Sequence, residues 1–405
     1  MVSEESEKLQ ALRQEVRTWL RENLPEGWGT PAYVPPVRGT AEAQAAGKEW
    51  SKKLYDAGYT GFTVPKEYGG VERPRDEQAV IREEMSRTGT PPGPGTLGYL
   101  AVAALMRWGT EEQKKRWIPK IMTNEECWCE CFSEPNAGSD LANLQKTGVR
   151  DGDDWIVNGQ SVWTSSSKFA DWGIVPVRTD VNAPRHRNLS FFVFDCKSPG
   201  FSVKPLRQMT GDAEFGETFF DDVRIPHANM IGEEGQGWYV AMGVLEAERG
   251  GGMRIGEGAA AVGVTTLGGV ENFVELAKNT KRRGQVAWDD PLFRQRIAQF
   301  AIENEAIRAS TQRMRVKAMK GQLTGHEQSI TSVYRREKNQ HQANMVAEMI
   351  GASIQYMRGD KRALDEGSWT YTFLRSRGNT IETGTTEINR GIIAERLLGL
   401  PRTRM

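Results

Sequence analysis

Two stretches decide how this chain folds: CFSEPNAGSD at residues 131–140 and, after a short spacer, DGDDWIVNGQSVWTSSSKFADW at residues 151–172. In the first, a short run of β-strand character ends at Glu134, and Pro135 opens a tight polar loop. A loop of this kind exposes backbone N–H groups beside the Ser139 hydroxyl. It therefore suits an anionic ligand.

The second stretch has the pattern of a strand. Apolar and polar residues alternate from Trp155 to Trp163, and the Asn158-Gly159 pair predicts a tight hairpin turn. Trp163 is followed by hydroxyl side chains up to Ser167, so a flat aromatic face lies beside small hydrogen-bond donors. A planar heterocycle with polar edges, such as a flavin, needs this combination. An ordinary solvated hairpin with a core tryptophan accounts for it equally well.

The composition is that of a globular protein and excludes several classes. The 405 residues include 38% hydrophobic and 26% charged residues, and the formal net charge is +0. A balanced charge gives no attraction to nucleic acid or to an anionic membrane surface. The chain has no apolar run of the roughly 18 residues that a membrane span needs, and residues 3–10 lack the apolar centre of a signal peptide. We expect a cytoplasmic protein with no membrane span.

Metal chemistry is not expected. Cys127, Cys129 and Cys131 alternate at strand spacing, which predicts that all three face one side of a sheet. This C-x-C-x-C spacing differs from the C-x-x-C spacing of zinc sites, and the four histidines are scattered. We therefore expect buried, reduced thiols and no metal ligands.

The periodicity of apolar residues predicts an α+β protein with several domains. Residues 1–125 have helical spacing and form an N-terminal all-helical domain. Residues 126–233 contain short β-branched and aromatic runs split by Gly, Pro and Asp, which predict a middle β domain of the barrel or sandwich type. Residues 234–405 return to long amphipathic helices and predict a C-terminal helical bundle of four helices.

The two opening stretches closely resemble the flavin-contacting signature of the acyl-CoA dehydrogenase family, T/S-E-P-x-A-G-S-D followed about thirty residues later by N-G-x-x-x-W-x-T/S. The order of helical, β and helical regions is also that of the family, including its bacterial fatty-acid and sterol-type members. The resemblance spans nearly the whole chain and implies FAD as cofactor. It implies that five residues lie near the flavin ring and the thioester: Phe132, Ser133, Ser139, Trp163 and Ser165.

A third match lies near the C-terminus, in NTIETGTTEINR at residues 379–390. It resembles the family's G-T-x-E/Q-I-x-R loop, so Thr385 and Glu387 match positions that contact the cofactor. Family members frequently carry the catalytic glutamate directly before the G-T pair, but this chain has Thr383 there and Glu382 one residue earlier. The resemblance also implies that the Thr383 backbone N–H binds the thioester oxygen.

The resemblance suggests a second place for the catalytic base. Removing the proton α to a thioester requires a carboxylate in a water-poor cleft. Some family members carry this glutamate on a helix, directly before an arginine, and LEAERG at residues 245–250 matches that site with Glu248 and Arg249. Glu246 points about 200° away around such a helix. We expect Glu248 to be the base and Arg249 to orient it or the thioester, with Glu382 as the alternative base. A simple ion pair of Glu248 with a nearby arginine is the non-catalytic alternative.

The resemblance therefore implies an oxidoreductase of lipid metabolism that converts an acyl-CoA to the trans-2-enoyl-CoA. Electrons would pass to an electron-transferring flavoprotein, and the assembly would be a homotetramer or homodimer, with a hetero-oligomer possible. Alternatives are a flavin oxidase or monooxygenase of the same fold, or a weakly catalytic subunit of a hetero-oligomer. Glycines at 250–252 hint at a bulky or branched acyl group.

Overall fold

The computed structural model describes residues 6–28, 33, 36–37, 39–91, 96–248 and 269–402. The chain divides into two compact units, Met1–Ala260 and Ala261–Met405. Arg249 and residues 250–252, to which the sequence assigns roles, lie outside the described residues. The three domain boundaries given above stay a prediction. Within the described ranges, no helix is long and apolar enough to cross a membrane.

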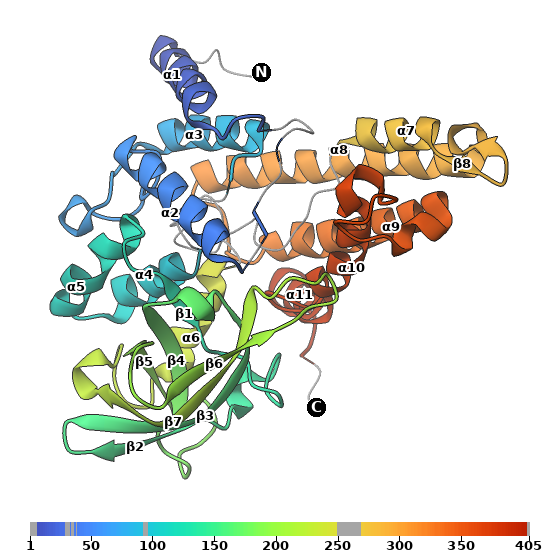
Figure 1. Cartoon of the computed structure of the whole chain (residues 1–405). Helices are drawn as coiled ribbons and strands as arrows, with labels where there is room; N and C mark the ends of the chain where they lie inside the picture. The colour runs from blue at the N-terminus through green and yellow to red at the C-terminus, as the bar shows by residue number, and fades with distance from the viewer. Residues whose placement is uncertain are drawn as a thin grey trace. The chain divides into compact units, whose positions relative to one another are not determined.

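The first unit begins with helices, as the apolar spacing predicts. Hydroxyl side chains accept backbone N–H groups at several helix starts, with Ser6 and Thr40 each capping one helix and Thr110 forming a capping box with Gln113. These caps satisfy amides that would otherwise lack partners. The helices are α1 (Glu7–Asn23), α2 (Ala41–Asp56), α3 (Arg75–Thr88), α4 (Thr96–Trp108) and α5 (Glu111–Met122) (Figure 1).

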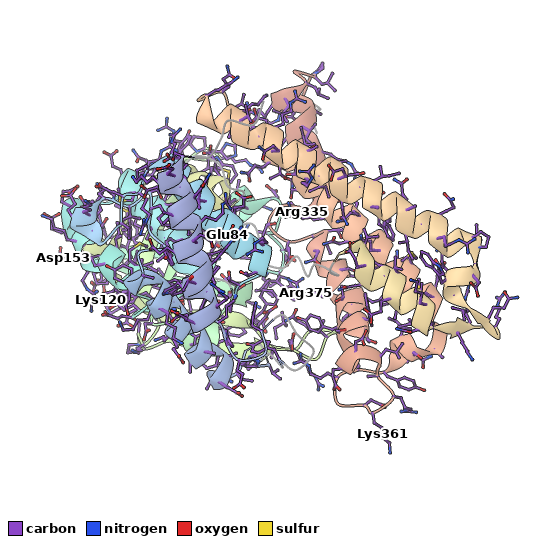
Figure 2. The ribbon with its side chains drawn as sticks, turned by 90° about the horizontal axis from the view of Figure 1, so that it is seen from above. Glu84, Lys120, Asp153, Arg335, Lys361 and Arg375 are labelled. Atoms are coloured by element: carbon purple, nitrogen blue, oxygen red, sulfur yellow. The ribbon has the colours of Figure 1, made fainter. Side chains whose placement is uncertain are left out.

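A buried carboxylate joins α1 to α3. The Glu84 side chain, labelled in Figure 2, is fully buried, and Arg13 and Arg17 of α1 donate to it at 2.6 and 2.8 Å. Arg87, one turn along α3, donates at 3.1 Å. Burial alone would raise the pKa of this carboxyl, but the arginines outweigh it and lower the pKa to about 2. The contact between the two helices therefore depends on an ionised Glu84.

A curled, mostly antiparallel sheet follows the helices. Its order is β1-β4-β2-β3-β7-β6, with β5 paired to β4, and Figure 1 shows the long strands β3 and β7 side by side. Strand β1 runs parallel to β4. The strands are β1 (Trp128–Glu130), β2 (Thr147–Asp151), β3 (Asp154–Ser165), β4 (Trp172–Arg178), β5 (Leu189–Asp195), β6 (Phe201–Leu206) and β7 (Phe215–Pro226).

The sheet contributes side chains to two separate cores. One core joins the sheet to α4 and to α6 (Gly237–Glu248), and the other consists of side chains from the strands themselves. Cys129 and Cys131 belong to the second core, in agreement with the alternation in the sequence. Cys127 is buried apart from them and accepts a hydrogen bond from the Gln44 amide at 2.8 Å. All four cysteines are free thiols.

The hairpin prediction at Asn158-Gly159 is wrong. Strand β3 runs through both residues, and the turn between β2 and β3 lies earlier, where Asp151 pairs with Asp154. A β-bulge against β7 occupies this position instead, and Gly159 has a φ of +141°. A Cβ on Gly159 would lie 2.6 Å from the Lys146 Cγ, so close approach of the neighbouring strand, rather than a turn, requires the glycine.

The second unit is helical around one aromatic core. Phe273, Phe293, Phe300, Met349 and Trp369 are among its buried residues. A two-stranded hairpin, β8 (Lys281–Arg282) with β9 (Gln285–Val286), follows the first helix. The helices are α7 (Val270–Asn279), α8 (Pro291–Met319), α9 (Gln328–Ile350), α10 (Ser368–Asn379) and α11 (Thr386–Ile392). The α+β class, with helices before and after a β region, is confirmed.

The ion cluster on Glu84 predicts an acid-sensitive contact between α1 and α3. Glu84→Gln should lower the free energy of unfolding at pH 7 by about 2 to 3 kcal/mol, because the buried site loses the charge that binds the half-buried Arg13 and Arg17. Since the pKa of Glu84 is lowered from 4.5 to about 2, the ionised group stabilises the fold above pH 4.5. That contribution is lost as the pH falls from 4.5 towards 2, so the difference between the two proteins should shrink over this range.

Urea unfolding at a series of pH values measures this effect. Glu83→Gln is the matched control, because the neighbouring Glu83 is half exposed and accepts one bond from Arg13 at 3.2 Å. It should change the free energy of unfolding by less than about 1 kcal/mol. A Glu84→Gln defect of constant size between pH 7 and pH 2.5 would contradict the proposed charge dependence.

Candidate active site

The loop that follows β1 is a closed turn. The Glu134 amide donates to the Ala137 carbonyl at 3.0 Å, and the Ala137 amide donates back at 3.1 Å. Phe132 lies in the core, where its ring meets Phe191 edge to face at 5.7 Å, and Ser139 is exposed. The turn therefore presents its tip to solvent while its base is held by apolar packing.

A buried ion pair fixes this turn to β2. The Glu134 carboxylate accepts the backbone amides of Gln145 at 2.6 Å and Lys146 at 2.9 Å, and also the Lys146 ammonium at 3.0 Å. Both side chains are almost inaccessible, and the ammonium also donates to the Phe132 carbonyl at 3.3 Å. Burial lowers the pKa of Lys146, and Glu134 opposes that shift. Glu134 is therefore a structural residue of the loop, and sequence reasoning missed its partner.

The same turn is bonded to β3. The Val162 amide donates to the Ser133 carbonyl at 2.8 Å, and the Ser161 hydroxyl donates to the Cys131 carbonyl at 3.2 Å. These bonds bring together the two stretches that the sequence singles out. Because Val162 directly precedes Trp163, its hydrogen bond places Ser133 next to Trp163 in the folded chain.

Trp163 projects from an irregular part of β3. The pairing with β7 shifts between Ser161 and Thr164, and Trp163 has a φ of +62°. A non-glycine residue in this left-handed region costs about 1 to 3 kcal/mol and is common at functional sites. The indole is 58% exposed and meets Phe215 edge to face at 5.9 Å, while Ser165 is half-buried. The bulge therefore turns a large aromatic face outward next to the loop.

Glu248 is the last described residue of helix α6. The buried side chains of the helix include Val240 and Val244, which lie four residues apart on one face. Glu248 lies four residues further along the same face and is half-buried. Glu246 is exposed, as the angle around the helix requires. Only one of the two carboxylates thus borders the apolar face. Arg249, the predicted orienting residue, lies outside the described residues.

In the second unit, Glu382 is occupied by two donors. Arg375, labelled in Figure 2, donates to one carboxylate oxygen at 2.6 Å, and the Asn379 amide donates to the other at 2.6 Å. The Arg375 side chain is 6% exposed, so this ion pair is largely shielded from water. Both oxygens of the Glu382 carboxylate are therefore engaged in hydrogen bonds within the second unit.

Thr383 carries an unusual backbone and a cationic partner. Its φ is +51°, and the Arg336 guanidinium donates to its hydroxyl and, at 2.6 Å, to the Gly384 carbonyl. Arg336 is buried. Sequence reasoning missed Arg336 and Arg375 because an arginine within a helical pattern gives no sign of whether it faces solvent or a loop.

The end of this loop starts α11. The Thr385 hydroxyl accepts the Ile388 amide at 3.1 Å as an N-cap, and Asn389 donates to the Gly384 carbonyl at 2.8 Å. Glu387 is exposed, and its own amide with the hydroxyls of Thr385 and Thr386 lowers the pKa of its carboxyl. The side chains of Arg336, Arg375 and Asn379, together with the Thr385 cap, therefore hold the loop in one conformation. Its role towards a cofactor stays a prediction.

The donor set of the first unit fits a flavin better than a metal. The outward ring of Trp163 follows Val162, whose amide is bonded to the Ser133 carbonyl of the tight turn, and Ser165 comes two residues later on the same strand. In the described parts of the chain, no group of three or more His, Cys, Asp or Glu side chains is arranged to hold a metal ion.

Models of three protein-family domains match the chain. They are the acyl-CoA dehydrogenase N-terminal domain at residues 6–125, the middle domain at residues 129–223 and the C-terminal domain at residues 235–398. Members of this family are flavoproteins that use FAD.

Relatives match over their full length. The acyl-CoA dehydrogenase IpdE1 of Mycolicibacterium smegmatis is 36% identical, with 98% of each chain covered, and that of Mycobacterium tuberculosis is 34% identical, with 97% of this chain and 98% of the relative covered. Among solved structures, the steroid ACAD Tcur3481-Tcur3483 has a TM-score of 0.79 at 29% identity over both whole chains. The ChsE4-ChsE5 complex from Mycobacterium tuberculosis has a TM-score of 0.75 at 27% identity, also over both whole chains. The chain belongs to the acyl-CoA dehydrogenase family, whose members are oxidoreductases that act on CH–CH groups.

Proposed function

We propose that this chain catalyses the FAD-dependent α,β-dehydrogenation of an acyl-CoA thioester to the trans-2-enoyl-CoA and passes the electrons to an electron-transferring flavoprotein. The observation that carries the proposal is the connection between the turn at residues 133–139 and the outward Trp163, made through the Val162 amide. An aromatic face beside hydroxyls and backbone donors is what a flavin ring requires. Membership of the family supports the class of reaction.

Each part of the reaction can be assigned to residues. Bound FAD would supply the acceptor for the hydride that leaves the β carbon. Ser139 and Thr383 are assigned to the thioester, whose oxygen gains negative charge as the α proton leaves. Thr385 and Glu387 are assigned to the dinucleotide part of the cofactor. Contacts with the flavin ring are assigned to Phe132, Ser133, Ser139, Trp163 and Ser165.

Glu248 is the better of the two candidate bases. The α proton must go to an ionised carboxylate that water does not fully solvate. Glu248 is half-buried beside an apolar helix row, whereas Glu382 has an arginine on one oxygen and an amide on the other. We therefore assign proton removal to Glu248. Arg249 is assigned to orient this carboxylate or the thioester.

The relatives support a bulky acyl group. One similar structure is a steroid ACAD. In the sequence, the proposed base is followed closely by glycines at 250–252, which have no side chain to occupy space. We propose a ring-containing acyl-CoA as the substrate class.

A second proposal concerns the subunits with which the chain assembles. Two of the similar structures carry the names of two subunits, Tcur3481-Tcur3483 and ChsE4-ChsE5. This favours a hetero-oligomer, in which the chain pairs with a second acyl-CoA dehydrogenase subunit, over a homotetramer or homodimer.

Anaerobic titration of the yellow protein with acyl-CoAs tests the reaction. Straight, branched, cyclic and steroid side-chain thioesters are added while the oxidised flavin band is recorded. Ring-containing thioesters should bleach the band fully, and straight short chains should bleach it slowly or not at all. The titration is repeated after co-expression with a candidate second subunit. A flavin that no thioester bleaches in either preparation would contradict the proposed reaction, and equal bleaching by all would contradict the substrate class.

Paired variants test the base. Glu248→Gln keeps the size of the side chain and should leave flavin bound while slowing its reduction by substrate about a thousandfold, because general-base catalysis contributes roughly 10² to 10⁴. Glu382→Gln is the control: it should lower the melting temperature by breaking the pair with Arg375, yet still be reduced. Stopped-flow absorbance measures both rates. If the flavin of Glu248→Gln were reduced at the normal rate and that of Glu382→Gln were not reduced, Glu382 would be the base.

Trp163→Ala tests the flavin surface. Loss of a stacking aromatic should weaken FAD binding about tenfold, whereas Trp163→Phe should retain most of the affinity. Isothermal titration of the apoprotein with FAD measures both constants. Unchanged affinity in Trp163→Ala would remove this residue from the proposed site.

A further inference from the structure

Thr383 has a backbone conformation that its own side chain disfavours. Its φ of +51° lies in the left-handed region, where a β-branched residue is a genuine outlier. Gly384 follows with a φ of +81°, which a glycine adopts readily. Nothing in the chemistry of threonine favours the first value, so contacts from elsewhere in the second unit must hold the residue in place.

Arg336 of α9 supplies such a contact. Its guanidinium donates to the Thr383 hydroxyl and, at 2.6 Å, to the Gly384 carbonyl. The Arg336 side chain is buried, so water competes little for either bond. Two nitrogens of one rigid, planar group therefore fix a side chain and the carbonyl of the next residue at the same time.

The residue before Thr383 is anchored in a different way. The Glu382 carboxylate accepts the Arg375 guanidinium and the Asn379 amide, each at 2.6 Å. These bonds hold a side chain and leave the backbone beyond it free to rotate. Among the described residues, Arg336 is the one whose side chain bonds to Thr383 itself.

Three consecutive backbone amides in this loop are available as donors. Within the described ranges, no group accepts a hydrogen bond from the amides of Thr383, Gly384 or Thr385. The Gly384 carbonyl is bonded to Arg336, and the N–H and C=O of a trans peptide point in opposite directions. The Thr385 N–H therefore points away from Arg336. Consecutive amides around left-handed residues form a concave set of donors that suits an oxygen with negative charge.

The Thr383 amide is the donor that the proposed function assigns to the thioester oxygen. This oxygen gains negative charge as the α proton leaves, and a donor that is already in place stabilises the charge without reorganisation. A donor on a loop that has to be ordered first would slow the reaction. The hold of Arg336 on Thr383 therefore matters at the step in which this charge develops.

We propose that Arg336 is a positioning residue for the reaction: its guanidinium holds Thr383 in the left-handed conformation, so that the Thr383 amide is ready to donate to the thioester oxygen as the α proton leaves. This role rests on the proposed function. Arg336 acts through its bonds to residues 383 and 384 and does not itself bind the thioester. Its shape is required as well as its charge, because a lysine ammonium lacks the planar fork that holds two acceptors.

Flavin reduction by substrate tests the role in the reaction. In Arg336→Gln, the rate at saturating substrate should fall roughly a hundredfold, because losing one donor to a developing oxyanion costs about 10² to 10³ in rate. The substrate concentration that gives half of the maximal rate should change little. Arg336→Lys keeps the charge without the fork and should be as slow as Arg336→Gln. Stopped-flow absorbance over a range of substrate concentrations measures all of these values.

Arg377→Gln is the matched control. Arg377 of α10 is half-buried and donates to the Asn344 side chain of α9 and, at 2.7 Å, to the Ser376 hydroxyl, so it also links helices of the second unit. Its loss should lower the melting temperature and leave the rate of flavin reduction normal. Equal slowing in Arg336→Gln and Arg377→Gln would overturn the inference, because the effect would then follow stability. A normal rate in Arg336→Gln or in Arg336→Lys would also overturn it.

Hydrogen exchange of the protein without substrate gives a second readout. The amides of Thr386 and Ile388 are each bonded next to the loop, at 3.0 and 3.1 Å, so a fixed loop protects them from exchange. Both should exchange about tenfold faster in Arg336→Gln, and Arg377→Gln should leave them unchanged. Unchanged protection in Arg336→Gln would contradict the inference, whatever the reduction rate.

Two changes at Thr383 decide the case if Arg336→Gln does not fold. Thr383→Val removes the hydroxyl that Arg336 binds, whereas Thr383→Ser keeps it. Thr383→Val should be reduced about tenfold more slowly than Thr383→Ser, because it loses a hydrogen bond to a charged group. Equal rates would contradict the role of Arg336. If no thioester reduces the wild type, the proposed function fails, whereas the exchange experiment still decides whether Arg336 holds the loop.

Discussion

The buried ion pair between Glu134 and Lys146 is the interaction on which the candidate site depends. It holds the turn after β1 against β2 by three hydrogen bonds to one carboxylate, and the opposite side of the turn is bonded to β3 next to Trp163. A buried pair of this kind adds little net stability, since removing two charges from water is costly. Its contribution is geometric, because only one arrangement of the turn satisfies every partner.

The chain treats its acidic residues in two opposite ways. Glu84, Glu134 and Glu382 each have a cation within hydrogen-bond distance, and these carboxylates join elements together. Glu130 on β1 is crowded by protein atoms instead, and this burial, followed by the charge of Glu248, raises the pKa of its carboxyl well above the usual value. At Glu84 the neighbouring arginines outweigh burial and lower the pKa of the carboxyl, whereas at Glu130 burial prevails and raises it.

Sequence reasoning predicted the order of helices and strands well, because apolar spacing depends on local geometry that a single sequence displays. It also found the stretches around Ser133 and Trp163. It failed at Asn158-Gly159, where a close approach by Lys146 requires the glycine and local turn preference is irrelevant. It could not find Arg336 or Arg375, because a charged residue in a regular pattern carries no local mark of the partner that it meets in the folded chain.

The bulges in β3 limit how this segment can change over evolutionary time. Its pairing with β7 is offset once after Val157 and again after Ser161, and Trp163 faces outward only because of the second offset. Successive strand residues point to opposite faces, so one residue gained or lost between the offsets would exchange the inner and outer side chains up to Ser165. The number of residues between the two offsets is therefore fixed, whatever the freedom of residue type at the individual positions.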